Sequence, residues 1–367
     1  MSILDRYILR MLAFNYVVSL GVMIGLYVVM DLFVNLDEFT EHGPSVGVLL
    51  RNIADYYLPG LLLYFSQLSG VITLFACVMT VARMRHFNEL TAILASGVSL
   101  YRVAAPVLVF GALTTSLLVV DTEVLIPRVA HLLARRHDEV GTLRGYSVAL
   151  MRDAEGTLLS GLEFIPAAGE LRRLVALSRD EEGALSRLVE ADTATWEAIP
   201  GHPHGGRWKL SRGRERKVEK ADASLPGPRG RQTLAQIHWL ETSLDPPSIQ
   251  LRQSEQWIRY LSLTQLRALE GSSPPNLAQV QQAGHVRVTT PIVNLVLLLL
   301  GLPFFLNRSP LYILRDATWC LACCGTCYAA TFTCQSILPG VNSALPAWLP
   351  IIVFGPVAMV LMDRVRT

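Results

Sequence analysis

Long stretches without a charged side chain divide this sequence into apolar flanks and a polar centre. A membrane-spanning helix needs about 20 mostly apolar residues, because the hydrocarbon core is about 30 Å thick and a helix rises about 1.5 Å per residue. The flanks supply such stretches at residues 11–30, 56–82, 103–120, 288–307 and 317–362. The last stretch is too long for one span, and Pro339, Gly340 and Pro346 favour a turn within it. The sequence therefore predicts six transmembrane helices, three on each side of the centre.

The placement of arginine predicts how these helices are oriented. Arg and Lys in short loops are retained on the cytoplasmic side of a membrane. The basic residues beside the predicted spans are Arg6, Arg10, Arg83, Arg85, Arg102, Arg308, Arg315, Arg364 and Arg366. All of them fall on one face of a six-span chain. We therefore expect both termini in the cytoplasm and the polar centre on the opposite side of the membrane.

The charged residues are concentrated in the centre. Of the 32 Lys and Arg, 22 lie between Asp121 and Arg287, together with 21 of the 30 Asp and Glu. Only 17% of the whole chain is charged, whereas a soluble protein has about 25%. The nearly neutral balance of the centre lacks the one-signed field that nucleic-acid binding requires. The composition thus predicts a membrane protein with a soluble-type insertion and no nucleic-acid partner.

The centre is patterned as a β domain. Short alternating segments predict strands at residues 147–152, 157–165, 171–178, 185–196, 207–210 and 248–252. Residues 225–230 read as a loop, and residues 262–270 as a helix that Ser262 caps. Many short strands favour an all-β sandwich or jelly roll. We expect a membrane α+β protein, with helices 1 to 3 in residues 1–126, an extracytoplasmic β domain of the sandwich or jelly-roll type in residues 127–285 and helices 4 to 6 in residues 286–367.

The segment between the second and third spans has the features of a short amphipathic helix. Asn88 is placed to cap it, Glu89 lies at its positive end, and Gly97 suits the left-handed position that ends a helix. One interpretation of residues 88–97 is a docking helix for a soluble partner, and the other is a helix that lies passively on lipid headgroups. The candidate docking residues are Arg83, Arg85, Glu89, Leu90, Ile93, Leu94 and Gly97.

Four cysteines in the fifth predicted span have the spacing of metal or redox motifs. They are Cys320, Cys323, Cys324 and Cys327. Their surroundings are rich in Ala, Gly and Thr and contain no His, which is typical of close helix packing. We interpret these cysteines as small apolar filler rather than as a metal site, and a thiol or metal carrier is the alternative.

The sequence contains no motif that would supply energy or catalysis. It has no G-x-x-x-x-G-K-[ST] phosphate-binding loop, no G-x-S-x-G and no H-E-x-x-H. The chain is therefore not expected to be an enzyme, and a partner must supply energy for any work that it does.

Several stretches of the chain resemble the LptF/LptG permeases of lipopolysaccharide export. The resemblance is strongest at residues 4–8, 89–99, 288–291 and 302–304. Residues 191–196 and 208–210 are similar to the jelly-roll strands of that family, and residues 261–266 to its link before the fourth span. The order of three spans, one β domain and three spans also matches.

The resemblance implies a permease subunit of an ABC transporter that extracts lipopolysaccharide from the bacterial inner membrane during outer-membrane biogenesis. Its partners would be a second LptF/LptG-type permease, an LptB-type cytoplasmic ATPase dimer, and LptC-type and LptA-type periplasmic bridge proteins. ATP and Mg would bind to the ATPase, and this chain would bind no cofactor. Residues 88–97 would be the coupling helix that enters a groove in the ATPase. The lipid cavity and lateral gate would be lined by Tyr27, Met30, Tyr328 and Phe332.

The sequence departs from the family near the outer end of the first span. Asp31, Asp37 and Glu38 occupy a region where basic residues of the family meet lipid phosphates. A less phosphorylated lipid, or charge supplied by the partner permease, is compatible with this difference. A non-transporting membrane scaffold whose periplasmic β domain binds a partner is the alternative function.

Overall fold

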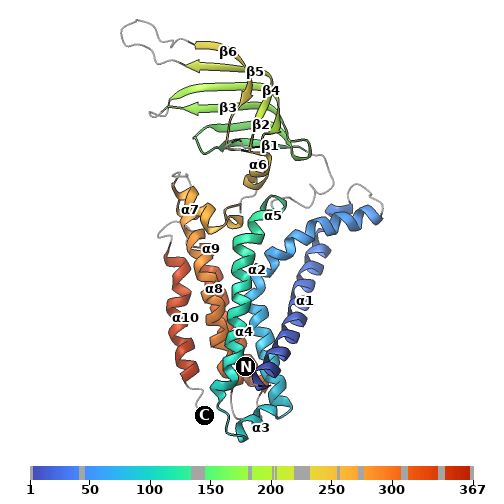
Figure 1. Ribbon diagram of the computed structural model, residues 1–367, viewed down its shortest axis with the longest axis vertical. Helices are drawn as coiled ribbons and strands as arrows, with labels where there is room; N and C mark the ends of the chain where they lie inside the picture. Colours follow the sequence, from blue (N-terminus) through green and yellow to red (C-terminus); the bar gives the residue numbers. More distant parts are fainter. Residues whose placement is uncertain are drawn as a thin grey trace. The chain divides into compact units, whose positions relative to one another are not determined.

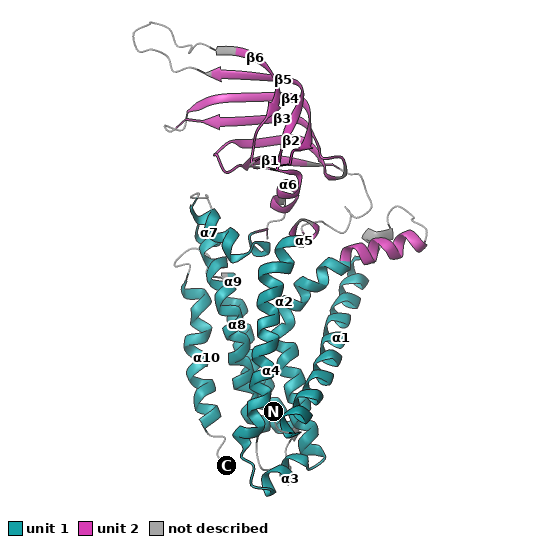
Figure 2. Ribbon diagram, viewed as in Figure 1, with its two compact units in different colours: residues 1–37, 57–129, 258–367 teal, residues 38–56, 130–257 magenta. Residues whose placement is uncertain are grey.

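The computed structural model describes residues 3–40, 46–133, 145–180, 184–200, 202, 205–218, 232–253, 257–271, 277–306, 313–337 and 344–363 (Figure 1). The chain forms two compact units, shown in different colours in Figure 2. The helical unit comprises residues 1–37, 57–129 and 258–367, and the sheet unit comprises residues 38–56 and 130–257.

Most of the helices belong to the helical unit, whereas residues 166–168 and 246–253 form helices of the sheet unit. In chain order the α-helices are α1 (Ile3–Thr40), α2 (Val46–His86), α3 (Glu89–Ala95), α4 (Leu100–Val120), α5 (Ile126–Leu133), α6 (Pro246–Gln253), α7 (Leu263–Gly271), α8 (Leu277–Phe305), α9 (Ile313–Ile337) and α10 (Leu345–Asp363). A π-helix, η1 (Asp121–Leu125), joins α4 to α5, and η3 (Pro166–Ala168) and η4 (Trp257–Tyr260) are short 3₁₀ helices.

Five of the described helical segments are long and apolar enough to cross a membrane. They are Ile3–Leu36, Val46–His86, Leu100–Ala130, Leu277–Phe305 and Leu345–Asp363. The predicted fifth span corresponds to α9, which is 25 residues long but is not among these five. Polar residues such as Thr326, Thr331 and Gln335 dilute the apolar residues of α9. The structure therefore confirms that apolar membrane-type helices precede and follow the sheet in the sequence. The count of six spans stays a prediction.

Helix α8 packs closely on α2 and α4 because small residues face it. A Cβ atom on Gly70 of α2 would lie 2.3 Å from the Asn294 side chain, and one on Gly111 of α4 would lie 2.3 Å from Leu298. In the reverse direction, a Cβ on Gly301 of α8 would lie 2.4 Å from Leu74. Membrane helices use small residues in this way, because they allow backbones to approach.

Polar side chains also join α1, α2 and α4. Asn15 Nδ2 donates to Thr80 Oγ1 at 2.7 Å, and Thr73 Oγ1 donates to Thr114 Oγ1 at 3.1 Å. Such hydrogen bonds between helices are worth about 0.6–2 kcal/mol in a membrane. Together with the glycine contacts they fix α2 against its neighbours.

The sheet unit contains one six-stranded antiparallel sheet. Its strands are β1 (Tyr146–Arg152), β2 (Leu158–Ile165), β3 (Glu170–Arg179), β4 (Leu185–Ala198), β5 (Gly206–Val218) and β6 (Gln232–Leu240). They pair in chain order from β1 to β6, so the described strands form a meander. The predicted β-rich centre is confirmed, whereas crossing connections between two separate sheets are not found among these strands.

The sheet bends along one line that crosses four strands. Buried residues in a flat strand are spaced by two, but here buried pairs are spaced by three. These pairs are Gly161 and Phe164, Leu171 and Leu174, Ala191 and Ala194, and Leu210 and Gly213. The strand pairing on either side places the four interruptions at one level. We call this level the crease.

The crease explains how a single sheet encloses a core. At this level Arg173 and Arg212 have positive φ angles of 48° and 54°, which reverse the direction of the following side chains. Both halves of each strand therefore direct apolar residues to the same interior. That interior contains Phe164, Leu171 and Trp208, all fully buried. The meander thus achieves with one folded sheet the enclosure that a jelly roll achieves with two.

Two parts of the predicted β domain need correction. Residues 248–252 are not a strand but belong to α6. Asp245 precedes this helix and caps it, because its Oδ1 atom accepts the backbone N–H of Ser248 at 2.8 Å. Strand β6 was not predicted at all, and β5 extends well beyond residues 207–210. The predicted loop at residues 225–230 and the turn at residues 339 and 340 lie outside the described residues, as do Arg308, Arg364 and Arg366.

Candidate functional site

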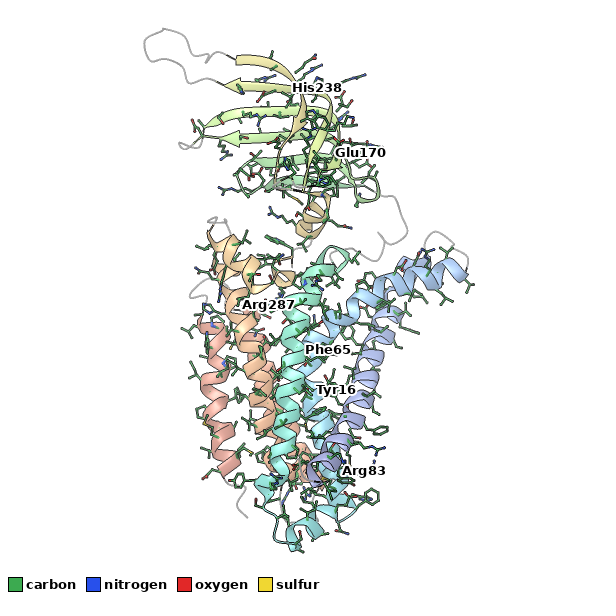
Figure 3. The ribbon with its side chains drawn as sticks, in the orientation of Figure 1. Tyr16, Phe65, Arg83, Glu170, His238 and Arg287 are labelled. Carbon is green, nitrogen blue, oxygen red and sulfur yellow. The ribbon has the colours of Figure 1, made fainter. Side chains whose placement is uncertain are left out.

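The short helix α3 lies at the end of the helical unit where several long helices begin or end. Arg102 near the start of α4 pairs with Asp5 near the start of α1 at 3.1 Å. Tyr101 donates to the carbonyl oxygen of Met362, near the end of α10, at 3.3 Å. Figure 3 shows Arg83 at this end of the unit and Arg287 towards the opposite end. We call the first of these the α3 end and the second the α7 end.

Backbone geometry sets the limits of α3. Asn88 has a left-handed conformation with φ 58°, and its carbonyl oxygen accepts the N–H of Ala92 at 3.0 Å. Its side chain makes no capping hydrogen bond, so the predicted side-chain cap is wrong. Gly97, by contrast, has the predicted left-handed conformation, with φ 84°.

The apolar face of α3 is directed into the helical unit. Leu90 is buried, and Ile93 and Leu94 pack against the same apolar core. The opposite face, including Thr91 and Ala92, is exposed. The apolar stripe therefore fastens α3 to its own chain, and any partner of α3 would meet the polar and small residues of the other face.

Phe87 is a candidate contact residue that the sequence analysis missed. It stands between α2 and α3 with 61% of its surface exposed. The Arg83 guanidinium lies 5.9 Å from the centre of its ring, and the His86 ring meets it edge-on at 5.1 Å. An exposed aromatic ring beside a cation is a common feature of protein interfaces. In the sequence, the position of Phe87 between the end of α2 and the start of α3 is the available signal.

The Glu89 side chain is hydrogen-bonded to Tyr7 of α1. Its Oε2 atom accepts a hydrogen bond from the Tyr7 hydroxyl at 2.9 Å. The two residues are 82 positions apart in the sequence. Glu89 therefore lies where the start of α1 meets the start of α3, with its side chain partly exposed.

Arg85 is not part of the exposed surface. Its side chain is 2% exposed, and its Nη1 atom donates to Asp316 Oδ2 of α9 at 3.0 Å. The carboxylate of Asp316 is 11% exposed and also lies 3.6 Å from Arg315. A buried ion pair of this kind costs desolvation energy and is sensitive to the loss of either partner. Arg85 thus connects the last turn of α2 to the first turn of α9.

The four predicted lipid-contact residues are exposed on α1 and α9. Tyr27, Met30, Tyr328 and Phe332 each expose 40% or more of their surface. The Tyr27 ring lies 4.3 Å from that of Tyr64 on α2, and the Tyr328 hydroxyl donates to the carbonyl oxygen of Gln67 at 3.5 Å. Tyr64 and Gln67 are one helical turn apart. Both helices therefore contact α2 at the same level.

Asp31 has a local structural partner. Its Oδ2 atom accepts the Tyr57 hydroxyl at 2.7 Å, and its Oδ1 atom accepts Asn35 Nδ2 at 3.3 Å. The carboxylate thus joins α1 to α2. The side chains of Asp37 and Glu38 lie outside the described part of the structure.

Charged residues at the α7 end hold the segment that leads into α8. Arg287 Nη2 donates to the carbonyl oxygens of Arg259 at 2.5 Å and Leu261 at 2.9 Å. Ser262 and Gln265 form a reciprocal capping box at the start of α7, which confirms the predicted Ser262 cap. The side-chain carboxylate of Asp121, buried in the π-helix, has no hydrogen-bond partner among the described residues, and the charge of Arg287 attracts it.

The cysteines of α9 fill space against α8. Cys324 Sγ lies 3.7 Å from the carbonyl oxygen of Leu297, and a Cβ on Gly301 would lie 3.2 Å from Cys320 Sγ. Within the described residues, no group of three or more His, Cys, Asp or Glu side chains has the arrangement of a metal site. The geometry therefore supports their interpretation as packing residues.

The sequence matches one protein family over nearly its whole length. The family is described as lipopolysaccharide export system permease LptF/LptG, and the match covers residues 6–364. No curated protein matches the chain. Apolar helices also precede and follow the antiparallel sheet in the sequence. The extent of the family match shows that this chain belongs to the LptF/LptG family of lipopolysaccharide export permeases.

Proposed function

We propose that this chain is the permease subunit of an ATP-driven exporter, which extracts lipopolysaccharide from the inner membrane and passes it to a periplasmic β-jelly-roll bridge. The observation that carries the proposal is the family match over residues 6–364. The chain would not hydrolyse ATP or bind a cofactor, since an LptB-type ATPase dimer would hold ATP and Mg.

The proposed topology places the α3 end in the cytoplasm. Arg83, Arg102 and Arg315 are all at this end, and basic residues in short loops are retained in the cytoplasm. Both termini would then be cytoplasmic, with helices 1 to 3 in residues 1–126 and helices 4 to 6 in residues 286–367. Residues 127–285 would form the periplasmic domain.

We propose that α3 is the coupling helix. Its exposed face and the neighbouring Phe87 are available to a groove of the ATPase, while Leu90, Ile93 and Leu94 anchor the helix to the membrane part of the chain. A short helix anchored in this way moves as part of the permease, so closure of the ATPase on nucleotide would be transmitted as a rigid-body motion. The partly exposed carboxylate of Glu89 would add a negative charge to the surface that α3 presents to the ATPase.

We propose that α1 and α9 provide the lipid gate. Tyr27, Met30, Tyr328 and Phe332 offer adaptable apolar surface for acyl chains. The gate would be completed by the corresponding helices of a second LptF/LptG-type permease. LptC-type and LptA-type proteins would receive the lipid from the sheet unit.

The test compares Glu89→Lys with Glu89→Gln in the complex with its ATPase, in vesicles that contain lipopolysaccharide. Reversal of the charge is expected to reduce ATPase binding and ATP-driven lipid release strongly, and the neutral variant is expected to reduce them less. Undiminished binding and release by Glu89→Lys would contradict the coupling role. A complex that binds only periplasmic proteins and releases no lipid would instead support the membrane scaffold.

A further inference from the structure

Two polar contacts connect the α3 region to the two helices that carry the proposed lipid gate. Tyr7 of α1 donates to Glu89 of α3 at 2.9 Å. Arg85, in the last turn of α2, donates to Asp316 of α9 at 3.0 Å. One contact therefore leads to the helix of Tyr27 and Met30, and the other to the helix of Tyr328 and Phe332.

We propose that Tyr7, Arg85 and Asp316 are positioning residues, which make α1 and α9 follow the movement of α3 when the ATPase closes. This proposal rests on the proposed function, because it assumes that α3 is the coupling helix and that α1 and α9 form the gate. It adds the physical links through which a force at α3 reaches the lipid.

The Arg85–Asp316 contact has the properties of a rigid link. Both side chains are buried, at 2% and 11% exposed, so water and salt screen their attraction little. Exposed ion pairs are weak and easily exchanged, whereas a buried charge that loses its partner is costly. Separation of α2 from α9 at this point would break a 3.0 Å contact between two buried charges, and Arg315 approaches the Asp316 carboxylate only at 3.6 Å. The two helix ends are therefore expected to move together.

The surroundings of Arg85 make it an extension of α3. Only His86, Phe87 and Asn88 separate Arg85 from Glu89, and the backbone N–H of Asn88 donates to the carbonyl oxygen of Arg85 at 3.0 Å. Leu90 is buried in the same apolar core as Met84. The turn from α2 to α3 is thus tightly held, and a displacement of α3 reaches Arg85 without a flexible joint.

The Tyr7–Glu89 contact is a softer link to α1. It is exposed, so its hydrogen bond competes with water. The start of α1 is held a second time by the Asp5–Arg102 pair, which joins it to α4 immediately after α3. Helix α1 is therefore linked to both sides of α3, while Arg85 links the α3 region to α9.

The decisive experiment uses the reconstituted complex of this permease, its paired permease and the ATPase in vesicles that contain lipopolysaccharide. The quantity measured is the amount of lipid released for each ATP hydrolysed. Asp316→Asn is expected to lower this ratio about tenfold, within the usual range of coupling between sites, while ATP hydrolysis continues. Tyr7→Phe is expected to lower it less. Thr318→Val, an exposed change on the same helix, is the matched control and should leave the ratio unchanged.

A charge exchange separates coupling from folding. The double variant Arg85→Asp with Asp316→Arg restores an ion pair of opposite direction and is expected to recover much of the lost ratio, whereas either single change is not. Spin labels at Thr91 of α3 and Phe332 of α9 give a second measurement. Addition of nucleotide should change their separation in the parent protein and change it less in Asp316→Asn.

The outcomes distinguish this inference from the proposed function. If the parent complex releases no lipid with ATP, the proposed function itself fails. If the parent complex releases lipid and Asp316→Asn is equally efficient, with an unchanged response of the spin labels, the linking role of Arg85 and Asp316 is overturned. A reduced ratio in Asp316→Asn that the charge exchange restores supports the inference.

Discussion

The carboxylate of Glu123 accepts the backbone N–H of Leu263 at 2.8 Å, although 140 positions separate the two residues. Leu263 is the first residue of α7, where backbone N–H groups have no partner within the helix. Glu123 belongs to the π-helix that follows α4. The segment entering α8 is therefore bound to the π-helix that continues α4 by a charge-assisted hydrogen bond.

Glu123→Ala should lower the free energy of unfolding by about 1–3 kcal/mol, because the N–H of Leu263 loses a charged acceptor in a partly buried position. Glu123→Gln keeps a side-chain oxygen acceptor and should cost less. Thermal unfolding of the purified full chain in detergent measures both variants. Equal melting temperatures for Ala and the parent protein would contradict the capping role.

Gly213→Ala should destabilise the sheet unit by about 1–3 kcal/mol, as overpacking of a close contact does. A Cβ at this position would lie 2.3 Å from the backbone carbonyl oxygen of Ile237, which cannot rotate away. Ser211→Ala, on the exposed face of the same strand, is the matched control. Denaturation followed by tryptophan fluorescence reports the difference, and an unaffected Gly213→Ala would show that the crease tolerates a side chain.

Trp208→Phe should lower the stability of the sheet unit by about 2–4 kcal/mol, through the lost volume and the lost hydrogen bond. Trp208 is fully buried, and its Nε1 atom donates to the carbonyl oxygen of Leu244 at 2.9 Å. Trp239→Phe makes the same change at a partly exposed ring that Arg207 covers at 3.6 Å. Chemical denaturation should give Trp208→Phe a much lower free energy of unfolding than Trp239→Phe. The opposite order would contradict the assigned core.

The stability of the sheet unit should fall as the pH rises through the titration range of Asp153. Burial raises the pKa of the Asp153 carboxyl, although hydrogen bonds from Thr157 and Thr242 oppose this shift. Because the folded state then binds the proton more tightly than the unfolded state, folding is favoured below the ordinary pKa of the carboxyl. This contribution is lost between the ordinary and the raised value.

Asp153→Asn provides the control for this pH dependence. The amide is neutral at every pH and retains an oxygen for the N–H of Thr157, which donates to Asp153 at 2.6 Å. Unfolding curves measured between about pH 3 and pH 7 should show a smaller slope in Asp153→Asn than in the parent protein. Identical slopes would assign the pH dependence to other groups.

Serine in place of Cys320, Cys323, Cys324 and Cys327 should preserve export. Serine is close in size to cysteine and forms a hydrogen bond within its own helix. A larger residue such as Leu at Cys320 should be harmful, because Gly301 of α8 leaves little room there. Loss of lipid export in the quadruple serine variant, with the protein still folded, would favour the thiol or metal carrier.

The sequence predicted the division into apolar helices and a β-rich centre because both depend on local patterns. Charge-free stretches identify membrane helices, and Ser262 and Gln265 have the spacing of a capping box. The strand predicted at residues 248–252 is wrong because the sequence before it carries the start signal of α6. Asp245 followed by Pro246 is a favourable N-cap and first helical position.

Other features depend on contacts that no local pattern contains. The crease is visible in the sequence only as apolar residues spaced by three, such as Leu171 and Leu174, and this spacing also suits a helix. Burial of Arg85 depends on Asp316, which is 231 positions away. From the sequence alone, an arginine near a helix end is predicted to be exposed, because its buried partner is not evident.

The measurement that tests the central claim most directly is purification of the tagged chain from its native membrane in mild detergent, with the bound proteins and lipids identified by mass spectrometry. The account predicts a cytoplasmic ATPase, a second permease of the same family and a lipid A-type glycolipid. Recovery of periplasmic proteins alone, without an ATPase or any glycolipid, would contradict it.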